Sequence, residues 1–141
     1  MPPSGKRWLL KTEPSAYSFD DLVREKKTVW GGIANALALQ NLRQAKKGDE
    51  VLIYHTGNEK AAVGLATLAS DPYPDPKAGD PKLVVVDVKA GKRLARKVTL
   101  AEVKANKKLA NLPLVKISRL SVVPVNDAEW GEILRLASAA D

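Results

Sequence analysis

Two apolar runs separated by a short polar segment constrain the fold more than any other feature of this chain. Residues 50–55 and 61–68 are rich in Val, Leu, Ile and Ala, and the segment 56–60 between them carries Gly57 and Asn58. Apolar runs of this length joined by a short segment with a glycine are typical of a β-hairpin. Because few polar residues interrupt either run, both strands are predicted to be buried.

The rest of the chain is predicted to form short strands and short helices in mixed order. Pro14 ends a first strand because proline withholds a backbone donor, and Pro124 indicates that a later strand lies at a sheet edge or a bulge. The expected strands span 7–12, 28–30, 83–88 and 120–125, and the expected helices begin after Ser18, Asn35, Thr99 and Asn126.

Strands of unequal length joined by a hairpin and by helices do not suit a doubly wound sheet, in which strand and helix alternate regularly. The pattern favours the α+β class, as a mixed β-barrel of about five to six strands with short flanking helices. Side chains fill the interior of such a barrel, so a ligand site has to lie at its rim. The polar and aromatic segments 11–17, 28–35 and 54–56 are the candidates for this rim.

The length of 141 residues suits one domain, expected over 1–141 with residues 1–6 as a disordered tail. The absence of cysteine and the single histidine, His55, exclude disulfides, a thiolate nucleophile and a zinc site, and no cofactor is expected. No apolar run approaches the ~20 residues that cross a bilayer, and the first residues lack a signal-peptide pattern. We therefore expect a cytoplasmic monomer with no membrane partner.

The formal net charge of +7 is concentrated in one quarter of the sequence. Residues 77–108 hold ten of the 23 basic and three of the 16 acidic residues, so the thirteen of each outside this segment cancel. Such a field attracts a polyanion such as nucleic acid. The alternative is a solvated face that keeps the protein soluble. Contacts with the phosphate backbone are predicted for Lys92, Arg93, Arg96 and Lys97.

Several motifs resemble those of the EVE domain family, over a span from about Arg7 to Leu136. They are Trp8-Leu9-Leu10-Lys11-Thr12-Glu13-Pro14, Trp30-x-Gly32 before Asn35, Asp49-x-Val51-Leu52-Ile53-Tyr54-His55 and Arg119-Leu120-Ser121-Val122. The resemblance implies a PUA-like barrel, related to YTH and ASCH domains, of a prokaryotic type. Several members of the family bind nucleic acid and take a modified base into a pocket with aromatic walls. The resemblance therefore implies a binding module whose partner is nucleic acid or a modified nucleoside.

A flipped base needs a flat aromatic wall and a few donors and acceptors around it. Trp30 is the first candidate for the wall, because the two glycines after it let a ligand approach the backbone. The alternative is that Trp30 fills one end of the barrel core. The candidate ligand-binding residues are Lys11, Thr12, Glu13, Tyr17, Trp30, Gly32, Asn35, Tyr54, His55, Arg119 and Ser121, with the last two, one strand step apart on one face, as possible phosphate contacts.

Strand alternation predicts that Lys11 and Glu13 lie on one side of the first strand and Thr12 on the other. In a binding role Lys11 holds a phosphate and Glu13 accepts from the base edge. In a structural role the two form a rim salt bridge. A lone histidine is often a structural hydrogen-bonding residue, but the family geometry implies that His55 lies at the pocket edge.

The sequence departs from the family pattern after Trp30. Members commonly have Asp or Ser at the next position and Arg three positions later, whereas this chain has Gly31 and Ala34. Leu37 and Leu39 stand where Gln and Arg are frequent. The helix that follows therefore has fewer donors for phosphate and more apolar surface. Three possibilities stay open: a nucleic-acid polymer, a free nucleoside, or a protein-interaction module with a vestigial pocket.

An enzyme is the rival to a binding module. In the related ASCH fold a Lys, a Thr and a Glu support an amidohydrolase that acts on acetylated cytidine, and this chain has Lys11, Thr12 and Glu13. A hydroxyl nucleophile needs its base within hydrogen-bond reach, whereas neighbours on a strand point to opposite faces. The pattern therefore favours a protein that is not an enzyme.

We expect the protein to give no turnover of acetylated cytidine above background when the products are separated by chromatography, because nucleophile and base diverge on the strand. Turnover that disappears in Thr12→Ala, with the fold intact, would contradict this expectation.

Overall fold

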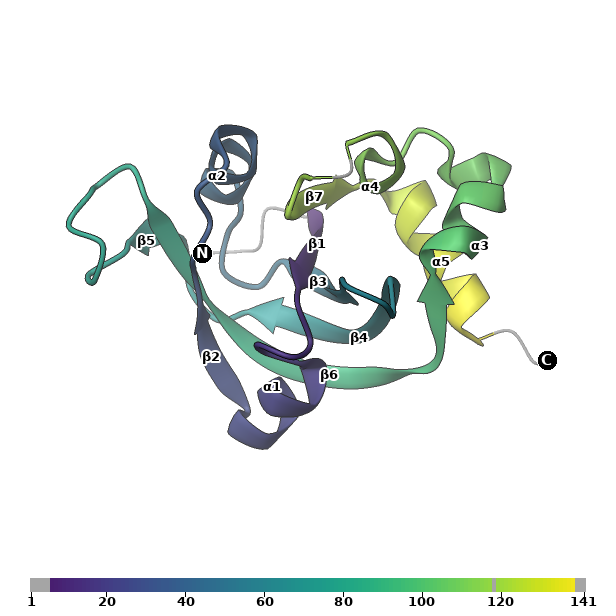
Figure 1. The fold of residues 1–141 in the computed structure, drawn as a ribbon, viewed down its shortest axis with the longest axis horizontal. Coiled ribbons are helices and arrows are strands. Elements are labelled where there is room, and N and C mark those ends of the chain that lie inside the picture. Colours follow the sequence, from purple (N-terminus) through teal and green to yellow (C-terminus); the bar gives the residue numbers. More distant parts are fainter. Residues whose placement is uncertain (1–5, 118, 139–141) are drawn as a thin grey trace.

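The computed structural model describes residues 6–117 and 119–138, which form strands and helices of the expected α+β class (Figure 1). The strands are β1 (Arg7–Thr12), β2 (Lys27–Trp30), β3 (Glu50–His55), β4 (Ala61–Leu68), β5 (Tyr73–Pro74), β6 (Val84–Thr99) and β7 (Val122–Val125). The helices are α1 (Phe19–Glu25), α2 (Ala36–Arg43), α3 (Leu100–Ala105), α4 (Pro113–Lys116) and α5 (Asp127–Ser138), with a 3-10 turn η1 (Lys107–Leu109).

The strands form one sheet in the order β2-β6-β4-β3-β1-β7, with β5 paired to β6. β1 and β3 are parallel, and the other pairs are antiparallel. The described residues thus contain seven strands rather than five to six. The sheet is curved but not closed into a barrel, because β2 and β7 stand at the two ends of the hydrogen-bonded order (Figure 1).

β6 is sixteen residues long, whereas the sequence predicted a strand over 83–88 that ended near Gly91. Gly91 continues the strand: a Cβ at this position would lie 2.7 Å from the carbonyl oxygen of Leu65 on β4. Glycine therefore lets two backbones approach instead of ending the strand. Beyond it Leu94 and Val98 are buried while their neighbours are more exposed, which is the alternation of a half-buried strand.

The predicted hairpin of β3 and β4 is confirmed, and nearly every residue in both strands is buried. Pro124 lies on β7, which pairs with β1 at the edge of the sheet, as expected. On β1 the indole Nε1 of Trp8 donates to the buried carboxylate of Asp49 over 3.0 Å. This bond ties β1 to the turn before β3.

Each predicted helix start is confirmed by a side-chain oxygen that accepts from the backbone N–H three residues further on, in Ser18, Asn35, Thr99 and Asn126. Such caps satisfy amides that have no partner inside the helix. η1 and α4 were not predicted, because elements of three and four residues are too short to show helical periodicity.

Of the expected six-residue tail, residues 1–5 lie outside the described part of the chain. Lys6 is exposed, and its Nζ donates to the side-chain oxygen of Gln44 over 3.2 Å. None of the described helices is long and apolar enough to cross a membrane.

α1 is fixed to the sheet at its first residue, Phe19, whose side chain is fully buried. The backbone N–H of Phe19 donates to Nε2 of His55 over 2.9 Å, and Nδ1 of His55 lies 2.6 Å from Oε1 of Glu59. Because Nε2 accepts, the ring proton is on Nδ1 and is donated to Glu59. The Phe19 ring packs on Gly64 of β4, where no side chain would fit.

We expect Gly64→Ala to destabilise the protein by about 1–3 kcal/mol, because its Cβ would overlap the Phe19 ring. Gly131→Ala is the matched control, since a Cβ there meets no atom within 4 Å and lies in α5. In a helix interior alanine is favoured over glycine by about 0.5–1 kcal/mol, so the control should gain stability. Urea unfolding measures both changes, and equal effects would contradict the packing argument.

Glu59 generates a prediction on pH dependence. The hydrogen bond from His55 holds the pKa of Glu59 below its ordinary value of 4.5. A carboxyl with a lowered folded-state pKa contributes stability above its unfolded pKa and loses it as the pH falls through the folded pKa. Glu59→Gln should therefore cost about 1 kcal/mol at neutral pH, reduced by partial exposure. This difference in unfolding free energy should shrink as the pH falls below about 5, and a constant difference would contradict it.

Candidate functional site

A cavity of about 270 Å³ lies where the end of β1, the segment before α1 and β2 meet. We call it the aromatic cavity; its lining residues are Thr12, Tyr17, Thr28, Val29, Trp30 and Gly31. The rings of Tyr17 and Trp30 stand at 88° to one another with centroids 6.0 Å apart. Trp30 is 8% exposed and belongs to the core. Trp30 therefore packs in the core, as one interpretation of the sequence predicted, and it also lines a cavity, as the other interpretation requires.

Local structure explains how the two rings are held. Thr28 and Trp30 are two residues apart on β2 and so share a face. Thr12 Oγ1 donates to the carbonyl oxygen of Tyr17 over 2.7 Å, which fixes the backbone before α1. The Tyr17 hydroxyl donates to Glu25 of α1. Burial, together with this hydrogen bond to the Glu25 carboxylate, raises the pKa of Tyr17, so its phenol stays neutral.

The residues after Trp30 form the connection from β2 to α2. A Cβ at Gly31 would lie 2.7 Å from Cγ1 of Val85, so the larger residues common in the resembling family would require Val85 to move. Gly32 has φ +73°, a conformation that favours glycine, and the space around it is open. The Asn35 side-chain oxygen accepts from the Ala38 N–H as the cap of α2. Leu39 of this helix is buried in the core.

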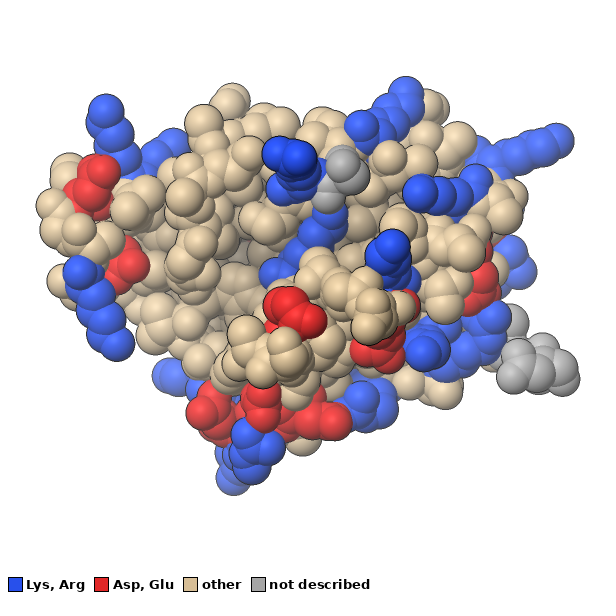
Figure 2. Space-filling model, in the orientation of Figure 1, with Lys and Arg blue, Asp and Glu red and all other residues tan. Residues whose placement is uncertain are grey.

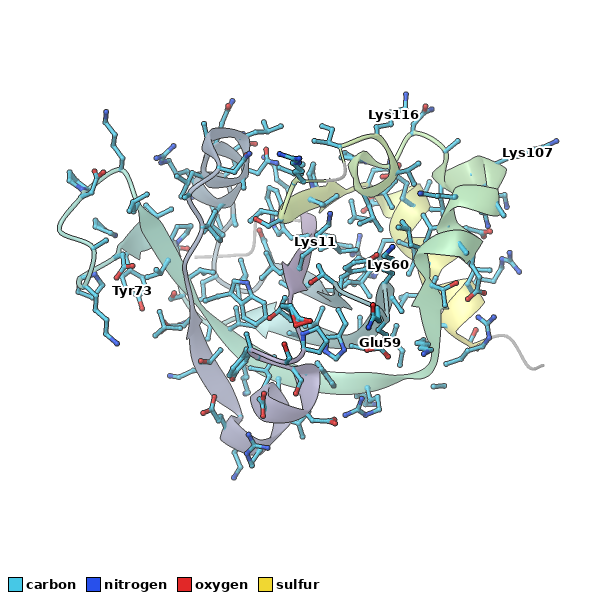
Figure 3. All side chains as sticks on the ribbon, viewed as in Figure 1. Lys11, Glu59, Lys60, Tyr73, Lys107 and Lys116 are labelled. Atoms are coloured by element: carbon cyan, nitrogen blue, oxygen red, sulfur yellow. The ribbon has the colours of Figure 1, made fainter. Side chains whose placement is uncertain are left out.

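A second cavity, of about 300 Å³, opens on the other side of β1. We call it the lysine cavity; it is lined by Lys11, Tyr54, Thr56, Gly57, Lys60, Leu100, Lys104, Leu114 and Val115. Nζ of Lys11 lies 5.9 Å from the centre of the Tyr54 ring, within cation–π range. Burial lowers the pKa of Lys11 and raises the pKa of Tyr54. In Figure 3 Lys11 and Lys60 lie near the centre of the view, whereas Lys107 and Lys116 project from its periphery.

Strand alternation distributes the triplet Lys11-Thr12-Glu13 as the sequence predicted, with Lys11 and Thr12 in different cavities. The Glu13 carboxylate accepts from the N–H and the hydroxyl of Ser15, at 2.9 and 2.7 Å, and these bonds lower the pKa of Glu13. The Thr12 hydroxyl donates to a backbone carbonyl. These contacts do not assemble a nucleophile and its base, so the geometry does not favour the enzyme.

The remaining candidates have structural contacts. Both ring nitrogens of His55 are engaged, with the N-terminus of α1 and with Glu59. Arg119 is exposed in a turn and Ser121 is in a bend, because β7 begins only at Val122. The expectation that Arg119 and Ser121 share a strand face is therefore wrong. The Ser121 carbonyl instead accepts from the N–H of Lys11 over 3.1 Å.

The four predicted phosphate contacts lie on β6 but do not form one patch. Arg93 pairs with Asp20 of α1 and lies 5.1 Å above the Phe19 ring. Arg96 pairs with Glu102 of α3 and donates to the Leu136 carbonyl of α5. Nζ of Lys97 lies 3.5 Å from Oε2 of Glu59. Lys92 lines a cavity apart from the two described above, together with Trp130 and Leu134 of α5. Alternation along a strand that packs against different helices separates these side chains.

Charge on the face in Figure 2 is distributed by element. Basic side chains are spread over the part that holds the end of β1, α3 and α4, while acidic side chains gather over α1. The acids of α1 are Asp20, Asp21 and Glu25. A polyanion on this face would therefore be favoured on the α3 side of β1.

Sequence reasoning missed several residues of the two cavities. Thr28 could have been found, because it is two residues before Trp30 on a predicted strand. Lys60 and Lys104 had no such signal: each is one lysine among many in the sequence, and they meet only because the turn after β3 lies beside α3.

Comparisons with known proteins agree with this architecture. The sequence profile of the EVE domain matches residues 6–136. Thymocyte nuclear protein 1 is 29% identical in Homo sapiens, over 92% of this chain and 72% of that protein, and 31% identical in Rattus norvegicus, over 94% and 74%. An ASCH protein from Zymomonas mobilis, 15% identical with a TM-score of 0.64 over 98% of this chain and 100% of its own, shares the fold.

Two solved structures are closely similar. Rpa0253 from Rhodopseudomonas palustris is 38% identical, with a TM-score of 0.90 over 96% of this chain and 95% of its own. Human THYN1, solved in complex with DNA that contains 5-methylcytosine, is 28% identical, with a TM-score of 0.89 over 96% and 99%. The family profile spans nearly all of the described residues, and the fold of its members is the fold found in this chain. The chain therefore belongs to the EVE domain family.

Proposed function

We propose that this protein is a binding module that takes a modified base of DNA, such as 5-methylcytosine, into the aromatic cavity. The observation that carries the proposal is the pair of perpendicular rings, Tyr17 and Trp30, that lines a cavity of about 270 Å³. This volume is just below the ~300 Å³ at which pockets for larger ligands begin, so it suits a single base. The human relative solved with 5-methylcytosine DNA supports the same ligand class.

The lining residues offer the contacts that a flipped pyrimidine requires. Stacking on an aromatic side chain contributes ~1–3 kcal/mol per base. The Thr12 hydroxyl proton is already donated to the Tyr17 carbonyl, so Thr12 offers the ligand acceptor capacity. Cytosine presents an exocyclic amine, which is a donor. A methyl group on the base adds apolar surface, for which the tryptophan face is a suitable neighbour.

We further propose that the module acts as a monomer. α2 has fewer hydrogen-bond donors for phosphate than the family pattern. This difference affects the expected affinity for DNA and does not alter the aromatic cavity. Leu39 is buried and Leu37 is half exposed, so this helix packs on the sheet and adds apolar surface at residue 37. We therefore expect contacts with the DNA backbone to come from elements other than α2.

Trp30→Leu tests the proposal, because leucine removes the aromatic face while it keeps apolar volume. We expect this variant to lose about 1–3 kcal/mol of binding to an oligonucleotide with 5-methylcytosine, measured by fluorescence anisotropy, and to lose its preference over the unmodified oligonucleotide. Trp130→Leu is the matched control, since Trp130 is equally buried on α5 and outside the aromatic cavity.

Both variants should melt at lower temperature than the parent protein, because each truncates a core tryptophan. Only Trp30→Leu should lose the preference for the modified base. Equal losses of binding in the two variants, or an unchanged preference in folded Trp30→Leu, would reject the aromatic cavity as the base site.

A further inference from the structure

The lysine cavity is not used by the proposed base site, although the two share the end of β1. We propose that the lysine cavity holds a phosphodiester group of the DNA strand whose modified base occupies the aromatic cavity. This inference rests on the proposed function and assigns it a second contact. It replaces the phosphate contacts that the sequence predicted on β6.

Three lysines from three separate elements line the cavity. Lys11 is on β1, Lys60 is in the turn between β3 and β4, and Lys104 is in the last turn of α3. Among the residues that the structure describes, every charged residue in the lining of the cavity is a lysine. The described part of the chain shows no ion pair for Lys60 or Lys104, in contrast to Arg93, Arg96 and Lys97. Cations without acidic partners are the ones available to a phosphate.

Glu13 and Glu59, the carboxylates on either side of the turn that carries Gly57, have other hydrogen-bond partners. Glu13 lies beside Gly57 at the rim, where its Oε1 is 2.8 Å from the position that a Cβ on Gly57 would take. Its other carboxylate oxygen accepts two hydrogen bonds from Ser15. Glu59 binds His55 and lies 3.5 Å from Lys97. Three lysines line the cavity and one carboxylate, Glu13, lies at its rim, so the net charge there is positive.

The backbone of Lys60 supports a functional role. Lys60 has φ +46°, in the left-handed region that residues with a Cβ seldom adopt. Its carbonyl oxygen accepts from the N–H of Leu100 over 2.8 Å, which fixes the turn to the start of α3. Glycine or asparagine would occupy this conformation at lower cost. Lys60 therefore combines a strained backbone with a side chain that lines a cavity, and strained residues cluster at functional sites.

The lysine cavity has an aromatic and apolar lining in addition to its charges. Its lining includes the Tyr54 ring, whose centre lies 5.9 Å from Nζ of Lys11, and the apolar side chains of Leu100, Leu114 and Val115. A phosphodiester joins two sugars, so it presents an anion next to apolar carbon surface. Basic groups beside an apolar wall match this combination better than they match an isolated inorganic anion.

The position of the lysine cavity relative to the aromatic cavity suits neighbouring groups of one strand. Lys11 and Thr12 are consecutive residues of β1 that line different cavities. Their α-carbons are therefore about 3.8 Å apart. A nucleotide with its base beside Thr12 would place an adjoining phosphate across the end of β1, on the side of Lys11.

The double variant Lys60→Gln with Lys104→Gln tests the inference, and Lys77→Gln with Lys82→Gln is its matched control. Both remove two positive charges from exposed lysines, but Lys77 and Lys82 belong to the loop between β5 and β6, outside the cavity. Binding of duplex oligonucleotides with and without 5-methylcytosine is measured over a series of salt concentrations.

We expect the cavity variant to flatten the slope of log binding constant against log salt concentration by about 1.8, at 0.9 per lost duplex contact. The loss of affinity should be the same for both oligonucleotides, so the preference for 5-methylcytosine stays intact. The control pair should change the slope by less than half as much. An unchanged slope, or an equal change in the control, would overturn the inference.

Two further outcomes separate this inference from the proposed function. If Trp30→Leu leaves the preference for the methylated oligonucleotide unchanged while the cavity variant flattens the slope, the base site is wrong and the phosphate site stands. If the cavity variant weakens binding of 5-methylcytidine monophosphate but leaves the oligonucleotide slope unchanged, the cavity serves a free nucleotide and the backbone assignment is overturned. A parent protein that binds neither oligonucleotide would reject the DNA-binding part of both.

Discussion

The attachment of Phe19 to the sheet is the interaction on which the rest of the site depends. The ring fills the space above Gly64 on β4, and the N–H of the same residue is bound by His55 on β3. Both contacts act on the first residue of α1, so they fix the segment before it. That segment carries Tyr17, whose ring packs edge-to-face with Trp30 and lines the aromatic cavity with it. A buried aromatic side chain thus determines the geometry of a polar site it does not line.

The parallel pairing of β1 with β3 gives the lysine cavity its form. In this register Lys11 is opposite Tyr54, so the cation and the ring are neighbours. Thr12 is opposite His55, whose nitrogens hold α1 and the turn after β3. Two consecutive residues of one strand therefore face two separate sites, because their side chains alternate. A shift of one residue in this register would exchange the two faces.

Much of the fold could be predicted because its signals are local. The caps of Ser18 and Thr99 lie within three residues of the amides they bind, and the β3–β4 hairpin is set by two runs and one turn. The length of β6 could not be predicted, since Gly91 breaks a strand in isolation but here allows contact with Leu65. The residues of the site were harder to predict from the sequence than the fold was. Trp30 was identifiable from its motif, whereas Lys104 joins Lys11 only through tertiary packing.

The basic stretch of β6 shows why formal charge is a poor guide to contacts. A count of charges over residues 77–108 treats every cation alike, but folding brings Asp20 to Arg93 and Glu102 to Arg96. Ion pairing makes these two side chains unavailable for contacts with a ligand, but it does not change the net charge of +7. The net charge still attracts a polyanion over distances of about a Debye length. Attraction and contact are therefore separate properties of the chain. The excess charge that attracts a polyanion is a sum over the molecule, while contacts require cations such as Lys60, for which the described residues show no acidic partner.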